Sequence, residues 1–109
     1  MITAQEIVKG KALAEQASLD FFRTKLNGKD QFACGFAWVD VFVDRTNSKQ
    51  AKELIAAGFK KDYKPKCLSM WNPGELPVQN IDIKEAGADA YAVYLRSLGL
   101  TAYSGSRLD

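Results

Sequence analysis

The clearest pattern along the chain is the alternation of side chains from Ala33 to Val43, which is typical of a β-strand. Because successive side chains of a strand point to opposite sides, this segment has one small aliphatic face and one aromatic face with a carboxylate. The aliphatic face consists of Ala33, Gly35, Ala37, Val39, Val41 and Val43. The aromatic face consists of Cys34, Phe36, Trp38, Asp40 and Phe42. The first face is suited to packing under helices, and the second must be covered by something else.

Apolar residues at helical spacing predict a long first helix over residues 3–26. Thr3 with Glu6 three positions later forms a capping-box pattern, so we place the start of the helix there. Asn27-Gly28 is a stop signal. The apolar stripe of this helix consists of Ile7, Leu13, Ala14, Ala17 and Phe21. The helix is long for a small domain and precedes the first strand, so it is the first candidate to cover a face of the sheet.

Capping residues predict two further helices. Asn47 or Ser48 can cap the second, because their side-chain oxygens accept hydrogen bonds from the amides of a first turn. Asp82 with Glu85 three positions later is a second cap pattern. It opens a third helix, which we predict over Ile83–Leu98.

Three shorter strands complete the pattern. Cys67–Trp71 alternates clearly, Leu76–Ile81 is a short segment that Pro77 would push toward a sheet edge, and Leu100–Ser104 is the last strand. After residue 32 the order is strand, helix, strand, strand, helix, strand. This is the split βαβ order of a ferredoxin-like sandwich. We therefore predict an α+β fold of this kind with an antiparallel sheet and an additional N-terminal helix.

Length and composition indicate a single domain over residues 1–109, with residues 1–28 as the N-terminal helix and residues 33–109 as the sandwich. Apolar residues make up 47% of the chain and the net charge is +2, so charge alone does not argue for nucleic acid or an anionic membrane. No apolar run approaches the ~18 residues of a membrane span, and no secretion signal is recognisable. We expect a cytoplasmic protein without membrane contact.

Histidine is absent, and cysteine occurs only at Cys34 and Cys67. The commonest general base near neutral pH is therefore missing, and a zinc site of the Cys/His or all-Cys type is excluded. The sequence has no glycine-rich phosphate loop, nucleophile elbow or paired-carboxylate motif. We expect no cofactor, no metal and no catalytic residue, and we favour binding over catalysis. The two cysteines are expected to be small buried side chains, with a redox pair as the alternative.

The predicted sheet gathers aromatic residues on one face, to which the second strand adds Cys67, Ser69 and Trp71. The sequence leaves three alternatives for what covers this face. We favour the N-terminal helix, because a monomer rarely leaves a large apolar patch bare. A second copy of the chain is the next choice, and the third is single-stranded nucleic acid, whose bases would stack on the rings. Its phosphates would contact a basic loop, otherwise a solvated turn, that consists of Lys60, Lys61, Lys64 and Lys66.

Two polar features could carry chemistry. Asp40 lies among aromatic residues, where a carboxylate can do acid–base work, although a strand end that emerges to solvent, or pairing with a nearby lysine or arginine, is the simpler interpretation. Ser106 and Arg107, near the C-terminus, could hold an anion. A frayed terminus is the favoured interpretation of that segment.

Several short motifs together resemble a group of small proteins encoded by tailed bacteriophages. The motifs are Cys34-Gly-Phe-Ala-Trp-Val39, Trp71-Asn-Pro73, Gln79, the helical Ala86, Gly87 and Ala90, Gly99, Tyr103 and Ser106-Arg-Leu-Asp109. They span residues 33–109. The resemblance implies an accessory or host-interaction factor in the cytoplasm of an infected bacterium, and it implies no catalytic residue.

We therefore expect an accessory protein that binds a host or phage macromolecule, foremost a protein, as a monomer or homodimer. Two alternatives stay open: a single-stranded nucleic-acid-binding module that uses the aromatic face, and a small-molecule or nucleotide pocket near Trp38, Trp71 and Arg107. The candidate binding residues, beside the basic loop, are Trp38, Asp40, Trp71, Asn72, Gln79, Tyr103, Ser106 and Arg107.

Overall fold

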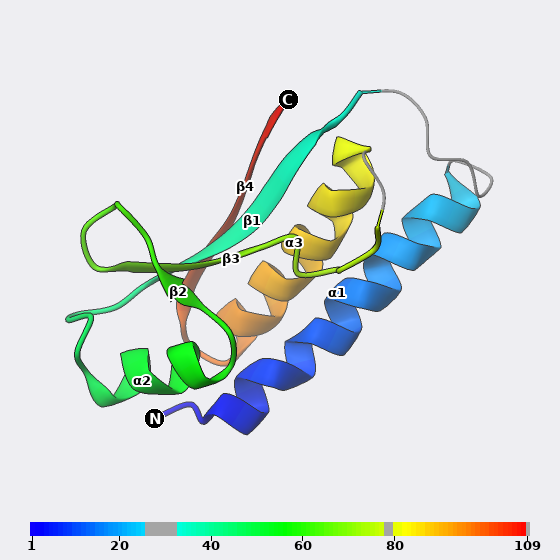
Figure 1. Cartoon of the computed structure of the whole chain (residues 1–109). Coiled ribbons are helices and arrows are strands. Elements are labelled where there is room, and N and C mark those ends of the chain that lie inside the picture. The colour runs from blue at the N-terminus through cyan, green and yellow to red at the C-terminus, as the bar shows by residue number, and fades with distance from the viewer. Residues whose placement is uncertain (26–32, 78–79, 109) are drawn as a thin grey trace.

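The computed structural model describes residues 1–25, 33–77 and 80–108, which form three helices and four strands (Figure 1). The helices are α1 (Ala4–Thr24), α2 (Lys49–Ala56) and α3 (Ile81–Ser97). The strands are β1 (Gly35–Phe42), β2 (Lys60–Lys61), β3 (Cys67–Trp71) and β4 (Thr101–Leu108). All neighbouring strands are antiparallel, in the order β2-β3-β1-β4. The predicted α+β class, antiparallel sheet and N-terminal helix are confirmed.

The aliphatic side of β1 forms the centre of the core. Val39 and Val41 have no exposed surface, as their place on the aliphatic face predicted. A single apolar cluster holds them together with Ile7 of α1, Leu54 of α2 and Leu95 of α3. All three helices therefore contribute to the core on this one side of the sheet.

α1 does not cover the aromatic side of the sheet, so that expectation is wrong. The buried stripe of α1 consists of Ile7, Gly10, Ala14 and Ser18. A Cβ atom at Gly10 would lie only 2.5 Å from the ring of Tyr91, so α1 approaches α3 closely at this glycine. The Tyr91 hydroxyl donates to the Ile7 carbonyl over 2.8 Å, and the Tyr94 hydroxyl donates to the Glu6 carbonyl over 2.6 Å. The small residues of α1 thus fit against the tyrosines of α3.

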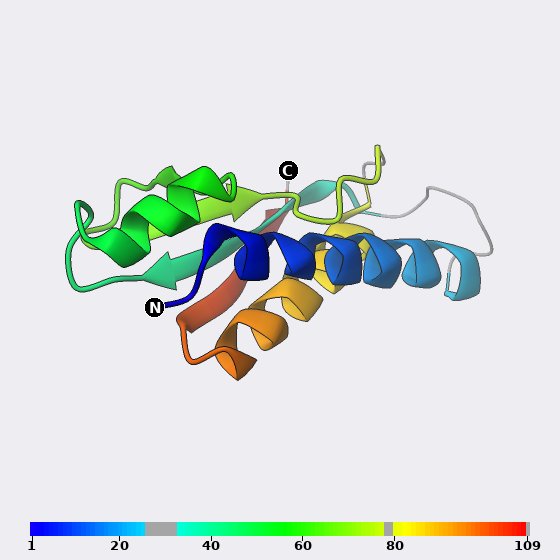
Figure 2. The ribbon, with the colours of Figure 1, turned by 90° about the horizontal axis from the view of Figure 1, so that it is seen from below.

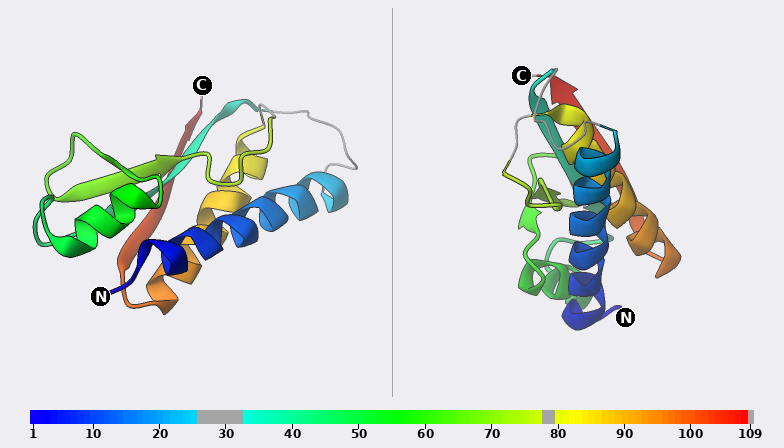
Figure 3. Two further views of the ribbon diagram at one scale, coloured as in Figure 1. Left: turned by 60° about the horizontal axis from the view of Figure 1, so that its bottom comes forward. Right: turned by 90° about the vertical axis from the view of Figure 1, so that its right-hand side faces the viewer.

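The start of α1 is tied to α2. The Ile2 amide donates to Oε1 of Gln50 over 2.9 Å, and the Ala4 amide donates to Oε1 of Glu53 over 2.8 Å. Figure 3 shows α1 running beside α3 with its N-terminal end close to α2, and Figure 2 shows α1 from below. Leu13, which the sequence placed in the packing stripe, is 49% exposed. The orientation of α1 therefore follows its small residues rather than its largest apolar ones.

Two of the three predicted caps are confirmed. Thr3 and Glu6 form the capping box at the start of α1, and Ser48 caps α2. α3 begins two residues before the predicted Ile83, and its cap is Asn80 rather than Asp82. The Asn80 side chain accepts a hydrogen bond from a main-chain amide of the first turn over 3.0 Å. The prediction used the right kind of signal, a short polar side chain just before an apolar helix. It placed the cap at Asp82, however, which is two residues after Asn80.

The strand expected over Leu76–Ile81 is wrong where the structure describes it. The beginning of this segment is irregular, and its end caps and starts α3. Gln79 lies outside the described residues. The additional strand is instead β2, which was predicted as loop and pairs with Ser69 and Leu68 of β3. The two exposed lysines of β2 show no apolar alternation, so the strand is recognisable only from its hydrogen-bonded pairing with β3.

β4 extends to Leu108, so the expected strand end at Ser104 and the frayed segment after it are both wrong. The whole strand pairs with β1, which is itself interior to the sheet. Arg96 of α3 donates from Nη1 to the Ala102 carbonyl of β4 over 2.8 Å.

No helix in the described part of the chain is long and apolar enough to cross a membrane.

Candidate functional site

The side of the sheet away from the core carries a group of aromatic rings, which we call the aromatic face. The aromatic face consists of Phe36, Trp38, Phe42, Trp71 and Tyr103. Trp71 is 50% exposed, Tyr103 is 55% exposed and Phe42 is 37% exposed, while the other two rings are half-buried. None of the three helices of the described residues covers these rings, because all three pack on the aliphatic side. The chain therefore presents an aromatic surface on the three strands β3, β1 and β4.

The rings form two groups along β1. Trp38 and Trp71 are directly paired across β1 and β3, and their rings stack with centroids 4.8 Å apart at an angle of 28°. The Phe36 ring meets Trp71 edge-on at 5.9 Å. At the other end of β1, Phe42 and Tyr103 lie 6.1 Å apart. Ring pairs at these separations stabilise a sheet across its strands, so the aromatic face is ordered without a covering helix.

Two cations lie over the first ring group. The Arg107 guanidinium is 5.5 Å from the Phe36 ring centre and 5.9 Å from that of Trp71. Lys84 of α3 donates to the Gly35 carbonyl over 2.8 Å and lies 5.3 Å from the Phe36 ring. Cations within about 6 Å of a ring centre are attracted electrostatically by the quadrupole of the ring, whose faces are negative. Arg107 is thus an exposed cation beside the most densely packed rings, whereas Lys84 is buried.

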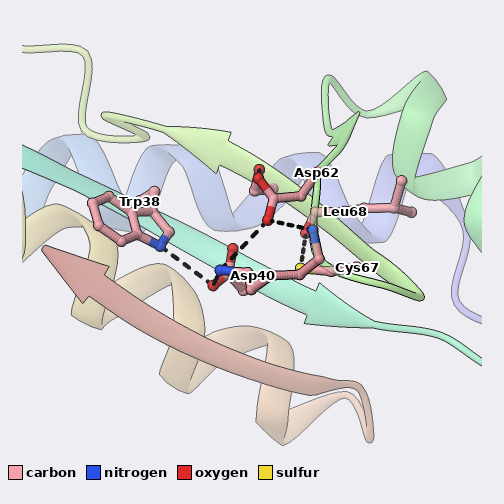
Figure 4. A network of polar contacts seen from close by, with 7 residues as sticks. Trp38, Asp40, Asp62, Cys67 and Leu68 are labelled. Carbon is pink, nitrogen blue, oxygen red and sulfur yellow. Dashed lines mark hydrogen bonds and ion pairs between the residues drawn. The ribbon is translucent and has the colours of Figure 1, made fainter.

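An ion-paired network separates the two ring groups (Figure 4). Oδ2 of Asp40 accepts hydrogen bonds from Trp38 Nε1 over 3.3 Å and from Lys64 Nζ over 2.7 Å. Lys64 Nζ also lies 3.5 Å from Asp62, and the hydrogen bond to Asp40 raises the pKa of Lys64 above its ordinary value. The Oδ1 atom of Asp40 is buried and has no hydrogen-bond partner among the described residues. The expected pairing of Asp40 with a lysine is confirmed.

The two cysteines lie at opposite ends of β1. Cys67 is opposite Phe42, and Cys34 precedes Phe42 by eight residues, which is roughly 26 Å along a strand. Both are free thiols, so they form no redox pair. Cys67 is fully buried, as expected, whereas Cys34 is exposed, which the sequence did not predict. Burial, and then the negative charge of Asp40, raises the pKa of the Cys67 thiol to about 11.

Two hollows adjoin Trp71. The smaller, of about 100 Å³, is lined by Trp38, Asp62, Tyr63, Lys64, Trp71 and Arg107. The larger, of about 750 Å³, extends from Trp71 past the two lysines of β2 to the turn that follows β3. Trp71 stands between them and contributes to both. The hollows place lysine and arginine side chains on both sides of an exposed indole.

The structure brings most of the candidate binding residues together. Those on or beside the aromatic face are Trp38, Asp40, Trp71, Tyr103 and Arg107. Ser106 does not join them, because it is opposite Ala37 and so lies on the helix side of the sheet. Asn72 lies in the turn after β3 with a φ of 45°, and its buried Oδ1 has no hydrogen-bond partner in the described ranges.

The four lysines of the basic loop are also divided, because only some of them lie beside the aromatic face. Lys64 reaches into the network of Figure 4, and Lys60 pairs with Ser69, which is opposite Asp40. Lys61 pairs instead with Leu68, a core residue, and Lys66 is exposed with a left-handed φ of 57°. Only part of the predicted cluster therefore faces the rings.

Sequence reasoning missed two residues of the site. Asp62 was passed over because the surrounding lysines made the loop a basic segment, although Asp62 balances the charge of Lys64. Lys84 was missed because nothing in the helical pattern of α3 indicates its hydrogen bond to Gly35, which is 49 residues away. Asp62 is only two residues from Lys64, so this pairing is local, whereas Lys84 required knowledge of where α3 packs on β1.

Comparisons with known proteins add no family. No protein-family model, no curated protein and no solved structure matches this chain. The functional argument therefore rests on the contacts described above.

Proposed function

We propose that the aromatic face binds single-stranded nucleic acid. The observation that carries this proposal is the exposure of aromatic rings on three neighbouring strands, with Arg107 beside them. Bases stack on exposed rings with little sequence preference, and lysine and arginine attract phosphates. These are the two interactions that a single strand needs from a protein surface.

The spacing of the two ring groups supports a strand that crosses the sheet. Trp38 and Phe42 are four residues apart on β1, which corresponds to roughly 13 Å. Bases could stack on each ring group along β1. A duplex keeps its bases stacked inside, so a flat aromatic surface favours unpaired strands.

The fold supports the same proposal. We propose that β1, α2, β2, β3, α3 and β4 form a ferredoxin-like sandwich to which α1 is added; the antiparallel order β2-β3-β1-β4 and the helices on one side agree with this arrangement. RNA-recognition modules stack bases on aromatic residues of a four-stranded sheet. The analogy concerns the fold alone, and the rings and cations of this chain carry the functional argument.

The expected setting is part of the proposal. The resemblance to proteins of tailed bacteriophages implied an accessory factor that binds a host or phage macromolecule in the cytoplasm. We keep that proposal and change the preferred partner from a protein to single-stranded nucleic acid. The reason is that the aromatic face, which we expected α1 to cover, is exposed.

Binding of labelled oligothymidylate and oligouridylate, followed by fluorescence anisotropy, tests the proposal. Trp38 and Trp71 are the two tryptophans of the chain and both lie on the aromatic face, so oligonucleotides should also quench the intrinsic fluorescence. Trp71→Ala should weaken binding roughly 5- to 150-fold, because stacking contributes about 1–3 kcal/mol per base. Trp71→Phe should retain most of the affinity.

Matched controls separate the aromatic face from the rest of the surface. Val93→Ala removes an exposed apolar residue of α3 and should not change binding. Arg107→Ala should weaken binding and reduce its salt dependence, whereas Arg23→Ala on α1 should do neither. Absence of binding to both oligonucleotides at low salt would reject the proposal. So would a dimer, detected by sedimentation, that Trp71→Ala dissociates.

A further inference from the structure

We propose that Asp40, Asp62 and Cys67 form a binding site for a divalent transition-metal ion of the Zn²⁺ class. One ligand atom from each of these residues lies within 4.8 Å of the others. The three residues come from β1, from the loop that follows β2 and from the first position of β3 (Figure 4). The site is independent of the proposed nucleic-acid binding. It differs from the Cys/His and all-Cys sites that the sequence excluded, because carboxylates supply two of its ligands.

The donor set selects the class of ion. Zn²⁺ accepts thiolate sulfur at about 2.3 Å and carboxylate oxygen at about 2.0–2.2 Å, and ligand atoms on a tetrahedral ion are then roughly 3.5 Å apart. The ligand atoms of Asp40, Asp62 and Cys67 would have to close by roughly 1 Å from their widest separation. Magnesium and calcium prefer oxygen ligands alone, so the thiol of Cys67 favours a softer ion.

An independent observation at Asp40 points to a missing partner. Asp40 is 8% exposed, and its Oδ1 atom has no hydrogen-bond partner among the described residues. Its other oxygen, Oδ2, is already bonded to Trp38 and Lys64. Leaving a buried acceptor without a partner is costly, and such atoms are rare in folded proteins. We take Oδ1 as the Asp40 ligand atom of the proposed site, so that a cation held between Asp40, Asp62 and Cys67 would leave Lys64 on Oδ2.

The proposed site has a net negative charge that a bound cation would offset. Asp40 and Asp62 carry two negative charges, against which Lys64 provides one positive charge. When a divalent ion binds, the S–H bond of Cys67 breaks, its proton passes to the buffer and a metal–sulfur bond forms. Two carboxylates and a thiolate then balance the ion together with Lys64. Cys67 has no exposed surface, so the metal–sulfur bond would be shielded from water.

Cobalt(II) titration of the full chain tests the site, because a thiolate bound to Co²⁺ gives a charge-transfer absorption band in the near ultraviolet. The Cys34→Ser variant keeps Cys67 as its one cysteine and should bind one ion per chain with this band, as the unaltered chain does. Cys67→Ser should lose the band and weaken binding by roughly 100-fold or more. Asp40→Asn should weaken binding while the band remains. Zn²⁺ should displace Co²⁺ and remove the band.

The pH dependence of Co²⁺ affinity in Cys34→Ser gives a second readout that needs no substitution at the site. Because the Cys67 thiol must lose its proton to form the metal–sulfur bond, the affinity should rise with pH between pH 6 and pH 8. Circular dichroism checks that Cys67→Ser is folded. Absence of the band in Cys34→Ser, or a band that survives in folded Cys67→Ser, would overturn the proposal. A Co²⁺ affinity that is independent of pH would do the same.

Discussion

The two sides of the sheet are built from the same strands in different ways. On the aliphatic side, Val39 and Val41 are covered by three helices and have no exposed surface. On the aromatic side, Trp38 and Trp71 stack on each other and the network around Asp40 fills the centre, while no helix of the described residues covers them. The difference teaches that a run of large aromatic residues in a strand does not by itself indicate a core.

The reason lies in how each side obtains its contacts. Helices reach the aliphatic side because its residues are small, and α1 approaches α3 through Gly10. The aromatic residues find partners within the sheet, where cross-strand neighbours lie about 4.5–5.5 Å apart at their Cβ atoms. Arg107 and Lys64 add charge that burial would make costly. An ordered exposed surface is the result.

The largest expected effect comes from truncating one residue on each side. Leu95→Ala removes a fully buried side chain of the helix side and should lower the free energy of unfolding by about 2–5 kcal/mol. Trp71→Ala removes a larger side chain that is half exposed, and the loss of its ring contacts should lower that free energy by about 1 kcal/mol. Urea denaturation measures both values.

In the oligonucleotide-binding experiment the order should be reversed, with Trp71→Ala losing more affinity than Leu95→Ala. Leu95→Ala should bind oligonucleotide normally under conditions where it is folded, and Trp71→Ala should bind weakly. Equal losses of stability in the two variants would mean that Trp71 belongs to a second core, and the contrast between the two sides would be lost.

Alkaline pH probes the buried acid on each side. The pKa of Cys67 rises from 9.0 in the unfolded chain to about 11 in the folded one, and burial also raises the pKa of Tyr91. Both groups therefore add stability that is fully present below pH 9 and is lost as the pH rises through their folded pKa values. For Cys67 the difference of two pKa units corresponds to about 3 kcal/mol. Urea denaturation from pH 8 to pH 11 with a chelator present measures the loss.

Substitutions measure how much of the alkaline loss of stability comes from Cys67 on the aromatic side and how much from Tyr91 on the helix side. Cys67→Ala should reduce the alkaline fall between pH 9 and pH 11, and Tyr91→Phe should reduce the part at higher pH. Cys34→Ala should leave the fall unchanged, because Cys34 is exposed. An alkaline fall that is identical in Cys67→Ala and the unaltered chain would contradict the burial of this thiol.

A smaller effect than that of Leu95→Ala concerns the close approach of α1 to α3. Gly10→Val would place side-chain atoms against the rings of Tyr91 and Tyr94, and should lower the free energy of unfolding by about 1–3 kcal/mol. Ala12→Val on the exposed side of the same helix changes helix propensity alone, at a cost of about 0.7 kcal/mol or less. Thermal unfolding followed by circular dichroism compares them. Equal melting temperatures would show that α1 does not pack on α3 through Gly10.

Local chemistry made part of the fold predictable. The alternation of residues 33–43 predicted β1 and both of its faces, and Thr3 and Ser48 predicted two helix starts. β2 was missed because an exposed edge strand of two lysines has no alternation to detect. The segment before α3 was taken for a strand because Asn80 was not recognised as a cap. These errors concern a few residues each and leave the class of the fold unchanged.

The placement of α1 and the network around Asp40 could not be predicted in this way, because both depend on contacts between distant segments. Lys64 is 24 residues from Asp40, and the arrangement of their strands decides whether they meet. For α1, the apolar stripe suggested a sheet face, while Gly10 and Ser18 were the better indicators of close helix packing. Small residues at helical spacing are a weak signal when the partner helix is unknown.

The hydrogen bonds from Tyr91 and Tyr94 to α1 have a consequence for the order in which the chain is made. They join residues that are 84 and 88 positions apart, so α1 leaves the ribosome long before α3, the helix that it contacts. Closing so long a loop is entropically costly, and contacts of this kind form late in folding. During synthesis α1 therefore has its partner only once nearly the whole domain has emerged. α1 is made well before α3, yet it can reach its final position only after α3 has emerged.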